Sequence, residues 1–504
     1  METSQNNNII NLGKHLPTII SILCCGFFIY LLKPLLFIDF WYDEVLSLEE
    51  FILVPLQKTV TDYSVPNNHI FFSILMNIWL KLWGITSFAD AADNIFVVRS
   101  LPLLFSTVTM FFVYRAGRIF GKLHGLLAIT ILLTTIPFYN FAVQIRGYGL
   151  SIMLCSMLLF YVLSFYKEPK KQNGIIITIL TALLLYTIPS NLYAILSALI
   201  ILGTVFLNQW YKYHFQVALQ FNAAKLIQWL LLGIGIGVLL YLPVGSQVVN
   251  NEYVKSEGFF RWEIWQEAIT FYTLLYTWDW VFYILLGIGL LQIQKDRKTW
   301  AWVLVFVLIL ILPFFISFVR GGKPFDRTFL WLIPVFAVGV SIIVGQGFKQ
   351  IKSKLNIFLQ ILFSTLLIFF LLRVTTNRAF EKYFLPYYSL NGEIKTQNIH
   401  YSYYLAKYNP HENLKNFKAE YYKEGTQVFL HEVDKYAMHG YLPVHGIKWQ
   451  PYIDTIPKLD KYYIITAFEG KAIEEFEAHD TAFEFRNISG EIDFVNIIEA
   501  KRKQ

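Results

Sequence analysis

The 504-residue chain is too apolar to be a soluble protein. Hydrophobic residues make up 56% of it and charged residues only 15%, with a mean hydropathy of +0.47, whereas soluble domains carry about 25% charged residues. This composition excludes soluble enzymes and nucleic-acid-binding domains, so the net charge of +7 is interpreted as an orientation signal in membrane loops and not as a nucleic-acid footprint. The composition predicts a polytopic membrane protein.

The first predicted element is an apolar run over 17–37, which is long enough to cross a bilayer. Lys14 precedes it and places the N-terminus in the cytoplasm, so that Asp43 and Glu44 emerge on the outer side. Adjacent carboxylates at headgroup depth are costly unless they have a function. The alternative is that the two acids only cap a surface helix.

The next apolar run, over 69–84, covers about 24 Å and is shorter than the hydrocarbon core of about 30 Å. We therefore predict an interfacial helix on the outer side, which places the basic residues Arg115, Arg118 and Lys122 in the cytoplasm. Later basic loops agree with this orientation. The predicted spans are 17–37, 95–114, 126–141, 150–166, 175–187, 193–207, 226–242, 268–291, 300–318, 329–344 and 357–372.

The composition changes towards the C-terminus. Alternating apolar runs at 427–432 and 462–467 predict strands, the charged segment at 471–477 predicts a helix, and the pattern over 483–498 predicts a hairpin. These elements indicate a small soluble domain that mixes helices and strands.

The predicted fold class is an all-α polytopic membrane protein with about eleven transmembrane helices, an outer interfacial helical segment and a small C-terminal soluble α/β domain. Residues 1–373 form the predicted transmembrane catalytic domain, with its first outer loop at 38–94, and residues 374–504 form the extracytoplasmic domain. The predicted location is the plasma (inner) membrane, multi-pass, with the active site on the extracytoplasmic side.

In this topology the polar residues suited to binding or catalysis gather on the outer side. Arg320, Lys323 and Arg327 lie there, against the tendency of cations to stay in the cytoplasm. Arginine binds phosphate oxygens through a planar fork, and a carboxylate serves as a general base. The pattern therefore favours a lipid phosphate substrate. The predicted site residues are Asp43, Glu44, His69, Arg146, Tyr148, Arg320, Lys323 and Arg327.

The order of these motifs along the chain also carries a resemblance. The segments are Tyr42-Asp43-Glu44, Val65-Pro66-Asn67-Asn68-His69, Val98-Arg99-Ser100-Leu101-Pro102, Ile136-Pro137, Gln144-Ile145-Arg146-Gly147-Tyr148 and Pro324-Phe325-Asp326-Arg327. Their order resembles the GT-C glycosyltransferases, in the branch that contains the protein O-mannosyltransferases and the lipid A aminoarabinose transferases. The resemblance covers about residues 30–340.

The resemblance implies a membrane glycosyltransferase that transfers a hexosyl or pentosyl group. The donor would be a polyprenyl-phosphate sugar, and the acceptor a lipid, glycan or protein of the cell envelope on the outer side. It makes Asp43 the catalytic acid, with Glu44 beside it. Many relatives carry His-Pro-Pro-Leu where this chain has Asn67-Asn68-His69-Ile70, so only His69 is carried over. A divalent cation near the acids is possible, but no metal-ligand spacing predicts one.

Structural alternatives remain open for three residues. His69 is also suited to cap the interfacial helix, Arg99 to anchor its helix at the interface, and Tyr148 to join an aromatic belt. Two other functions remain open for the whole chain. A polysaccharide or lipid flippase would place its charges near the midplane with paired repeats, and a scaffold would leave Asp43 and the outer arginines unexplained.

Overall fold

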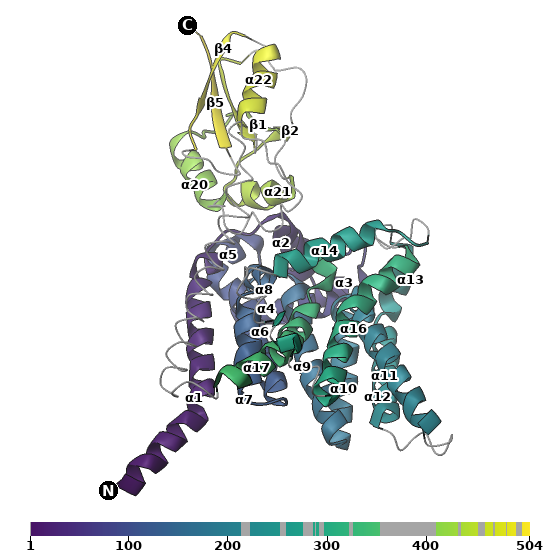
Figure 1. Cartoon of the computed structure of the whole chain (residues 1–504). Helices are drawn as coiled ribbons and strands as arrows, with labels where there is room; N and C mark the ends of the chain where they lie inside the picture. Colours follow the sequence, from purple (N-terminus) through teal and green to yellow (C-terminus); the bar gives the residue numbers. More distant parts are fainter. Residues whose placement is uncertain are drawn as a thin grey trace. The chain divides into compact units, whose positions relative to one another are not determined.

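The structure is a computed structural model of the whole chain (Figure 1). It describes residues 2–212, 222–251, 259–275, 286–287, 289–291, 297–321, 326–352, 410–431, 435–451, 459–466, 469–479, 481–489 and 496–503. The chain divides into two compact units. The first unit contains Met1–Leu32, Val60–Ile74 and Leu101–Thr376, and the second contains Lys33–Thr59, Leu75–Ser100 and Asn377–Gln504.

The first unit is helical in its described residues. Its helices are α1 (Glu2–Leu31), α7 (Lys122–Leu133), α8 (Ile136–Phe141), α9 (Gly147–Lys167), α10 (Lys171–Thr187), α11 (Leu192–Lys212), α12 (Asn222–Leu240), α13 (Gly245–Asn250), α14 (Glu263–Leu275), α16 (Arg297–Arg320) and α17 (Leu332–Lys352). The short 3-10 turns η3 (Pro189–Asn191), η5 (Leu242–Val244) and η7 (Asp326–Phe329) join them. The helices α4 (Ile70–Leu82) and α6 (Ile95–Arg118) contribute residues to both units.

Five stretches of the described chain are long and apolar enough to cross a membrane, as a multi-pass protein requires. They are Ile95–Arg118, Gly147–Lys167, Pro189–Tyr211, Asn222–Leu240 and Thr299–Arg320. Four shorter apolar helices accompany them, at Pro17–Leu31, Ile70–Leu82, Lys122–Leu133 and Leu332–Gln346. The predicted count of about eleven is not confirmed. The predicted span at 357–372 and most of the one at 268–291 lie outside the described residues.

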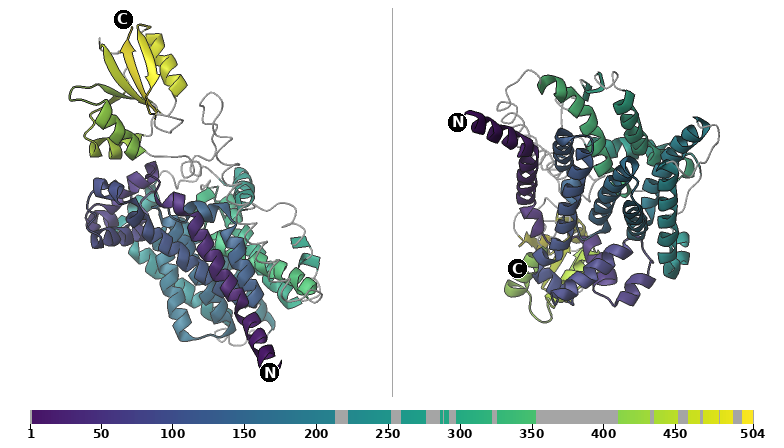
Figure 2. Two further views of the ribbon diagram at one scale, coloured as in Figure 1. Left: turned by 90° about the vertical axis from the view of Figure 1, so that its left-hand side faces the viewer. Right: turned by 90° about the horizontal axis from the view of Figure 1, so that it is seen from below.

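Small residues let helices of the first unit approach closely. The pair α10 and α12 packs along much of its length, as the two views of Figure 2 show. A Cβ at Gly233 would lie 2.6 Å from Cβ of Thr181, and one at Gly174 would lie 2.3 Å from the ring of Trp229. Close backbone approach of this kind stabilises helix pairs inside membranes, where no hydrophobic effect drives them together.

The predicted span at 126–141 is wrong as a single helix. The structure has two helices, α7 and α8, separated at Thr134 and Thr135. Pro137 has no N–H to continue the ladder. The hydroxyl of Thr134 donates to the carbonyl of Thr130 at 2.9 Å, and that of Thr135 donates to Leu132 at 2.8 Å. The carbonyls of Thr130 and Leu132 thus accept a threonine hydroxyl in addition to a backbone N–H, which is the local side-chain bonding that competes with continuation of a helix.

The helix α4 is as short as the sequence predicts. Its 13 residues cover about 20 Å, less than the hydrocarbon core of about 30 Å. It therefore fits the predicted interfacial segment and is too short to cross the membrane alone.

The second unit joins helices of the first loop to a small α/β domain. Its helices are α2 (Tyr42–Ser47), α5 (Phe88–Asp93), α20 (Pro410–Glu420), α21 (Lys435–Val444) and α22 (Glu469–His479), with the turns η1 (Lys33–Leu36) and η2 (Leu48–Ile52); α3 (Leu56–Thr61) begins in it. Its strands are β1 (Val428–His431), β2 (Gln450–Pro451), β3 (Lys461–Thr466), β4 (Phe483–Asn487) and β5 (Asn496–Arg502).

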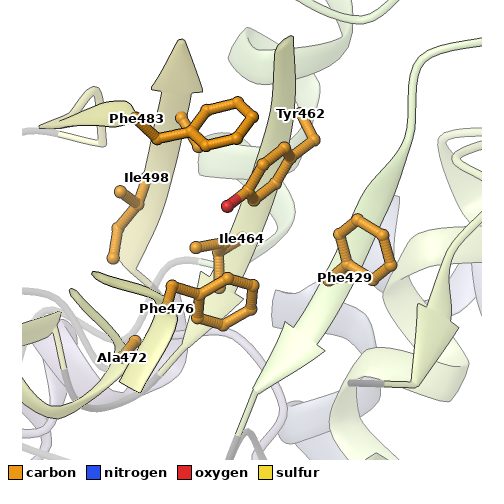
Figure 3. Packing of buried hydrophobic residues seen from close by; sticks show 8 residues of the cluster. Phe429, Tyr462, Ile464, Ala472, Phe476, Phe483 and Ile498 are labelled. Carbon is orange, nitrogen blue, oxygen red and sulfur yellow. The ribbon is translucent and has the colours of Figure 1, made fainter. Parts of the chain in front are cut away.

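The sheet has the order β2-β1-β3-β5-β4, in which β2, β1 and β3 are parallel and β5 is antiparallel to both of its neighbours. Figure 3 shows its core, in which Phe476 of α22 lies against Tyr462 and Ile464 of β3. Phe476 follows Ala472 by one helical turn, so both face the sheet. The predicted strands, helix and β4–β5 pairing are confirmed.

Candidate functional site

The two candidate carboxylates lie in the first turn of α2. Trp41 precedes the helix in an extended conformation, and its N–H donates to Oε2 of Glu44 at 3.3 Å. Glu44 thereby satisfies a backbone donor at the helix start, and both acids are favoured there by the helix dipole. Asp43 is 2% exposed and Glu44 is fully buried. The capping alternative is therefore partly correct for Glu44, but burial of both acids rules out a plain surface helix.

Glu44 forms a buried ion pair with Arg99 of α6. Nη1 of Arg99 donates to Oε1 of Glu44 at 2.9 Å, and Nη2 donates to Oε2 at 3.0 Å. Both side chains are 0% exposed. Two parallel bonds between a guanidinium and a carboxylate fix orientation as well as charge. The pair therefore holds α2 at a defined position relative to α6.

Arg99 also fixes the chain just before α2. Its guanidinium donates to the carbonyls of Ile38 and Asp39, at 3.0 and 3.2 Å, and lies 5.3 Å from the centroid of the Phe40 ring. A fully buried arginine with these partners is not a headgroup anchor, so that alternative for Arg99 is wrong. Arg99 instead holds together residues 38–44, which are called the acidic loop below.

Asp43 stands beside this pair without being part of the Arg99 fork. Consecutive residues of an α-helix point about 100° apart, so the carboxylates of Asp43 and Glu44 leave α2 in different directions. The backbone carbonyl of Asp43 accepts a hydrogen bond from Ser47 at 2.7 Å, which closes the helical turn. Glu44 thus takes part in the buried Arg99 pair, and Asp43 lies next to it in the same helical turn.

The C-terminal domain holds the other side of the same loop. Oη of Tyr441, on α21, accepts the backbone N–H of Phe40 at 2.6 Å. The carboxylate of Asp39 accepts the backbone N–H of His411, on α20, at 2.7 Å. Tyr441 is fully buried. The segment that leads into α2 is therefore held by residues about 370 to 400 positions away along the chain.

Close packing accompanies these bonds. A Cβ added to Gly440 would lie 2.7 Å from Cγ1 of Val45, so only glycine allows α21 to approach α2 this closely. Nε2 of His411 lies 3.3 Å from a carboxylate oxygen of Asp93 on α5. Burial lowers the pKa of the neighbouring His445 to about 4, and the charge of His411 lowers it further.

A second polar cluster lies in the first unit, where α9 begins. Nδ1 of His69 accepts the backbone N–H of Gly147 at 2.8 Å. A Cβ at Gly147 would lie 2.6 Å from that of His69, so glycine is required for this approach. Nη2 of Arg146 donates to Oδ1 of Asn67 at 3.0 Å. The Tyr148 ring lies 5.0 Å from the His69 ring and 5.2 Å from Cζ of Arg146.

This cluster is buried and positively charged. Arg146 is 2% and His69 is 2% exposed. Burial lowers the pKa of His69 to about 3, and the positive charge of Arg327 adds to the effect. His69 is therefore neutral at pH 7, and because its Nδ1 accepts, its remaining proton is on Nε2. The residue offers one neutral N–H donor beside two guanidinium groups.

The three remaining predicted cations differ in where the structure places them. Arg327 lies in η7, is half-buried and acts electrostatically on His69. Arg320, at the end of α16, is exposed and Nη1 lies 3.3 Å from Oη of Tyr193. Tyr193 in turn lies 6.1 Å from the ring of Phe329 in η7. Lys323 lies outside the described residues, so its predicted role is untested.

Some residues of these clusters had a sequence signal and others had none. Arg99 was visible as a charge at the start of an apolar helix. Tyr441 and His411 had no signal, since their partners lie far away in sequence. No group of three histidine, cysteine or acidic side chains suited to a metal ion occurs in the described parts of the chain. A divalent cation therefore remains a prediction.

The comparisons with known proteins establish the fold. No protein-family model and no curated protein matches the sequence. Among solved structures, the crystal structure of ArnT from Cupriavidus metallidurans bound to undecaprenyl phosphate matches with a TM-score of 0.52 and 11% sequence identity, over 95% of this chain and 97% of that one. The chain has a GT-C-like fold.

A second solved structure gives a weaker similarity. It is that of ArnT from the same organism in the apo state, with a TM-score of 0.48 at 10% identity, over 98% of both chains. The match to the lipid-bound structure confirms the predicted resemblance in fold.

Proposed function

We propose that this protein is a membrane glycosyltransferase that moves a sugar from a polyprenyl-phosphate donor to an acceptor on the outer side of the membrane. The buried carboxylate pair of α2 carries the proposal. Glu44 is held by Arg99, and Asp43 lies next to it in a loop that two groups of contacts hold in place. A flippase would place its charges near the midplane within paired repeats, whereas sugar transfer uses a carboxylate as a general base.

The two clusters supply two chemical roles. Arg146 and Arg327, with Lys323 and Arg320 of the same predicted outer face, bind the phosphate of the donor through charge-assisted hydrogen bonds. His69 adds a neutral N–H from Nε2, and Tyr148 fixes the ring of His69 by packing against it. Positive charge there stabilises the lipid phosphate as it becomes the leaving group.

Asp43 acts on the acceptor. Its carboxylate takes the proton of the acceptor hydroxyl or amine as that oxygen or nitrogen bonds to the anomeric carbon of the sugar. The bond between the anomeric carbon and the phosphate oxygen breaks, and polyprenyl phosphate leaves. Glu44 holds Asp43 in position through the Arg99 pair. The solved ArnT structure with undecaprenyl phosphate supports this donor class.

The test measures sugar transfer in detergent micelles, where a flippase has no sealed membrane to act across. Radiolabelled undecaprenyl-phosphate sugars and delipidated envelope material from a strain lacking the protein serve as donor and acceptor. We expect Asp43→Asn to lower the rate by about 10² to 10⁴, because the amide keeps the shape but cannot take the proton. Expression and the thermal midpoint should equal those of the wild type.

Two outcomes would refute the proposal. One is the absence of transfer by the wild-type protein from every donor. The other is an Asp43→Asn variant with the turnover of the wild type, which would return Asp43 to a structural role in α2.

A further inference from the structure

Two buried carboxamides lie in the segment that leads from α8 to α9. Asn140, near the end of α8, and Gln144, two residues before Arg146, are each 1% exposed. Within the described part of the chain, neither the nitrogen nor the oxygen of either amide has a hydrogen-bond partner. Buried polar side chains nearly always have hydrogen-bond partners. Four buried amide atoms without a partner in one short segment therefore require an explanation.

The segment folds back so that its start approaches the polar cluster of His69, Arg146 and Tyr148. The ring of Phe141, the neighbour of Asn140, lies 5.3 Å from that of Tyr148. Tyr148 in turn contacts His69 and Arg146. The hydroxyl of Ser106 donates to the carbonyl of Ala142 at 2.7 Å and holds the turn against α6. The backbone that carries both amides therefore lies in the same region as the proposed phosphate ligands.

We propose that Asn140 and Gln144 bind hydroxyl groups of the donor sugar. This inference rests on the proposed function, in which Arg146 binds the donor phosphate. The sugar is bonded directly to that phosphate, so groups near the phosphate ligands meet the sugar ring. A carboxamide donates through its nitrogen and accepts through its oxygen, which matches a hydroxyl group that also does both.

The same two residues bear on the class of sugar. Within 136–149 the only charged residue is Arg146, and no acidic residue occurs. The two amides of this segment match neutral hydroxyls, which donate and accept as they do. We therefore expect an uncharged hexosyl or pentosyl group to be preferred to an amino sugar.

The experiment separates sugar binding from phosphate binding. Equilibrium dissociation constants are measured in detergent for undecaprenyl phosphate alone and for its glucosyl, mannosyl and 4-amino-4-deoxyarabinosyl esters. The proteins are the wild type, Asn140→Leu and Gln144→Leu, with Gln144→Met as an unbranched second variant. Thr181→Val is the matched control, because Thr181 on α10 also carries a buried hydroxyl without a partner among the described residues but packs against Gly233 of α12.

We expect the wild type to bind one neutral-sugar ester more tightly than bare undecaprenyl phosphate. The variants of Asn140 and Gln144 should weaken that ester by about tenfold to a hundredfold, since a sugar hydroxyl loses its buried partner, and leave undecaprenyl phosphate unchanged. Thr181→Val should change neither constant. Thermal midpoints equal to or above that of the wild type would show that the variants fold.

Other results would overturn the inference. If the Asn140 and Gln144 variants lose the same affinity for the ester and for bare lipid phosphate, these residues have a general structural role. If they lose affinity for neither, the amides do not bind the sugar. The same holds for a wild type that binds no ester better than the bare phosphate, or that prefers the amino sugar. A wild type that does not bind undecaprenyl phosphate at all would refute the proposed function itself.

Discussion

The buried pair of Glu44 and Arg99 provides the most direct test of how the acidic loop is held. Replacing Arg99 by leucine removes both bonds to Glu44, at 2.9 and 3.0 Å, and those to the carbonyls of Ile38 and Asp39. The carboxylate of Glu44, which is fully buried, then loses both of these bonds. Breaking a buried ion pair in this way costs about 3–5 kcal/mol. We expect Arg99→Leu to lower the free energy of unfolding by that amount.

A double-mutant cycle isolates the pair from the surrounding contacts. Glu44→Leu alone removes the carboxylate that the buried guanidinium of Arg99 binds, at a similar cost of about 3–5 kcal/mol. The double variant removes both charges of the pair, together with the carbonyl bonds of Arg99 and the bond from the Trp41 N–H to Glu44. It should therefore be more stable than the sum of the single changes predicts, by up to about 3 kcal/mol. Thermal unfolding in detergent, followed by tryptophan fluorescence, measures all four proteins.

The same variants test whether the pair positions Asp43. Transfer rates against donor concentration, at a temperature where each variant is folded, should show a lower kcat with an unchanged KM for the donor. If the destabilisations of the two single variants simply add in the double variant, the two charges do not interact. If Arg99→Leu unfolds at the wild-type temperature, the reasoning from burial is wrong.

Three further predictions concern the other contacts. Arg327→Lys should lower kcat/KM for transfer by about tenfold to a hundredfold, because lysine cannot replace a planar two-bond grip on phosphate; membrane insertion serves as the control, and unchanged kinetics would remove Arg327 from the site. Neutral His69 stabilises the fold fully above its ordinary pKa of 6.5, and this contribution is lost as the pH falls towards its folded pKa of about 3. The thermal midpoint of His69→Gln should therefore fall less between pH 6.5 and 4 than that of the wild type, and parallel curves would contradict this. Tyr441→Phe leaves a buried N–H of the acidic loop without its partner, so it should cost about 1–3 kcal/mol of stability and lower kcat with little change in KM; a loss of stability with wild-type kcat would show that Tyr441 only stabilises the domain.

The sequence by itself determined the membrane class and most of the helices. Apolar runs long enough to span a bilayer produce helices whatever their neighbours are, because backbone groups in lipid must be paired within the segment. The predicted runs at 95–114 and 150–166 correspond to α6 and α9. The order of short motifs was enough to predict the resemblance that the GT-C-like fold confirms. The apolar run that forms β3 was likewise a local signal, and the structure contains that strand, buried at five successive positions.

Local hydropathy was less informative where a helix is interrupted. The run at 126–141 is apolar throughout, yet it divides at Thr134 and Thr135 before Pro137. The hydropathy pattern does not record that threonine hydroxyls also bond to the carbonyls at the end of α7. The predicted boundary at 373 falls among residues outside the described ranges and stays a prediction.

Only the tertiary structure showed how Glu44 is held. The sequence does not indicate that Glu44 pairs with Arg99, 55 positions away. The same holds for Tyr441, which binds the backbone of Phe40 across 401 positions. Such contacts depend on where distant segments meet after folding, and nothing in the local composition of either segment encodes its partner. For this reason the acidic residues of the loop could be singled out from the sequence, whereas the contacts that hold the loop in place could not.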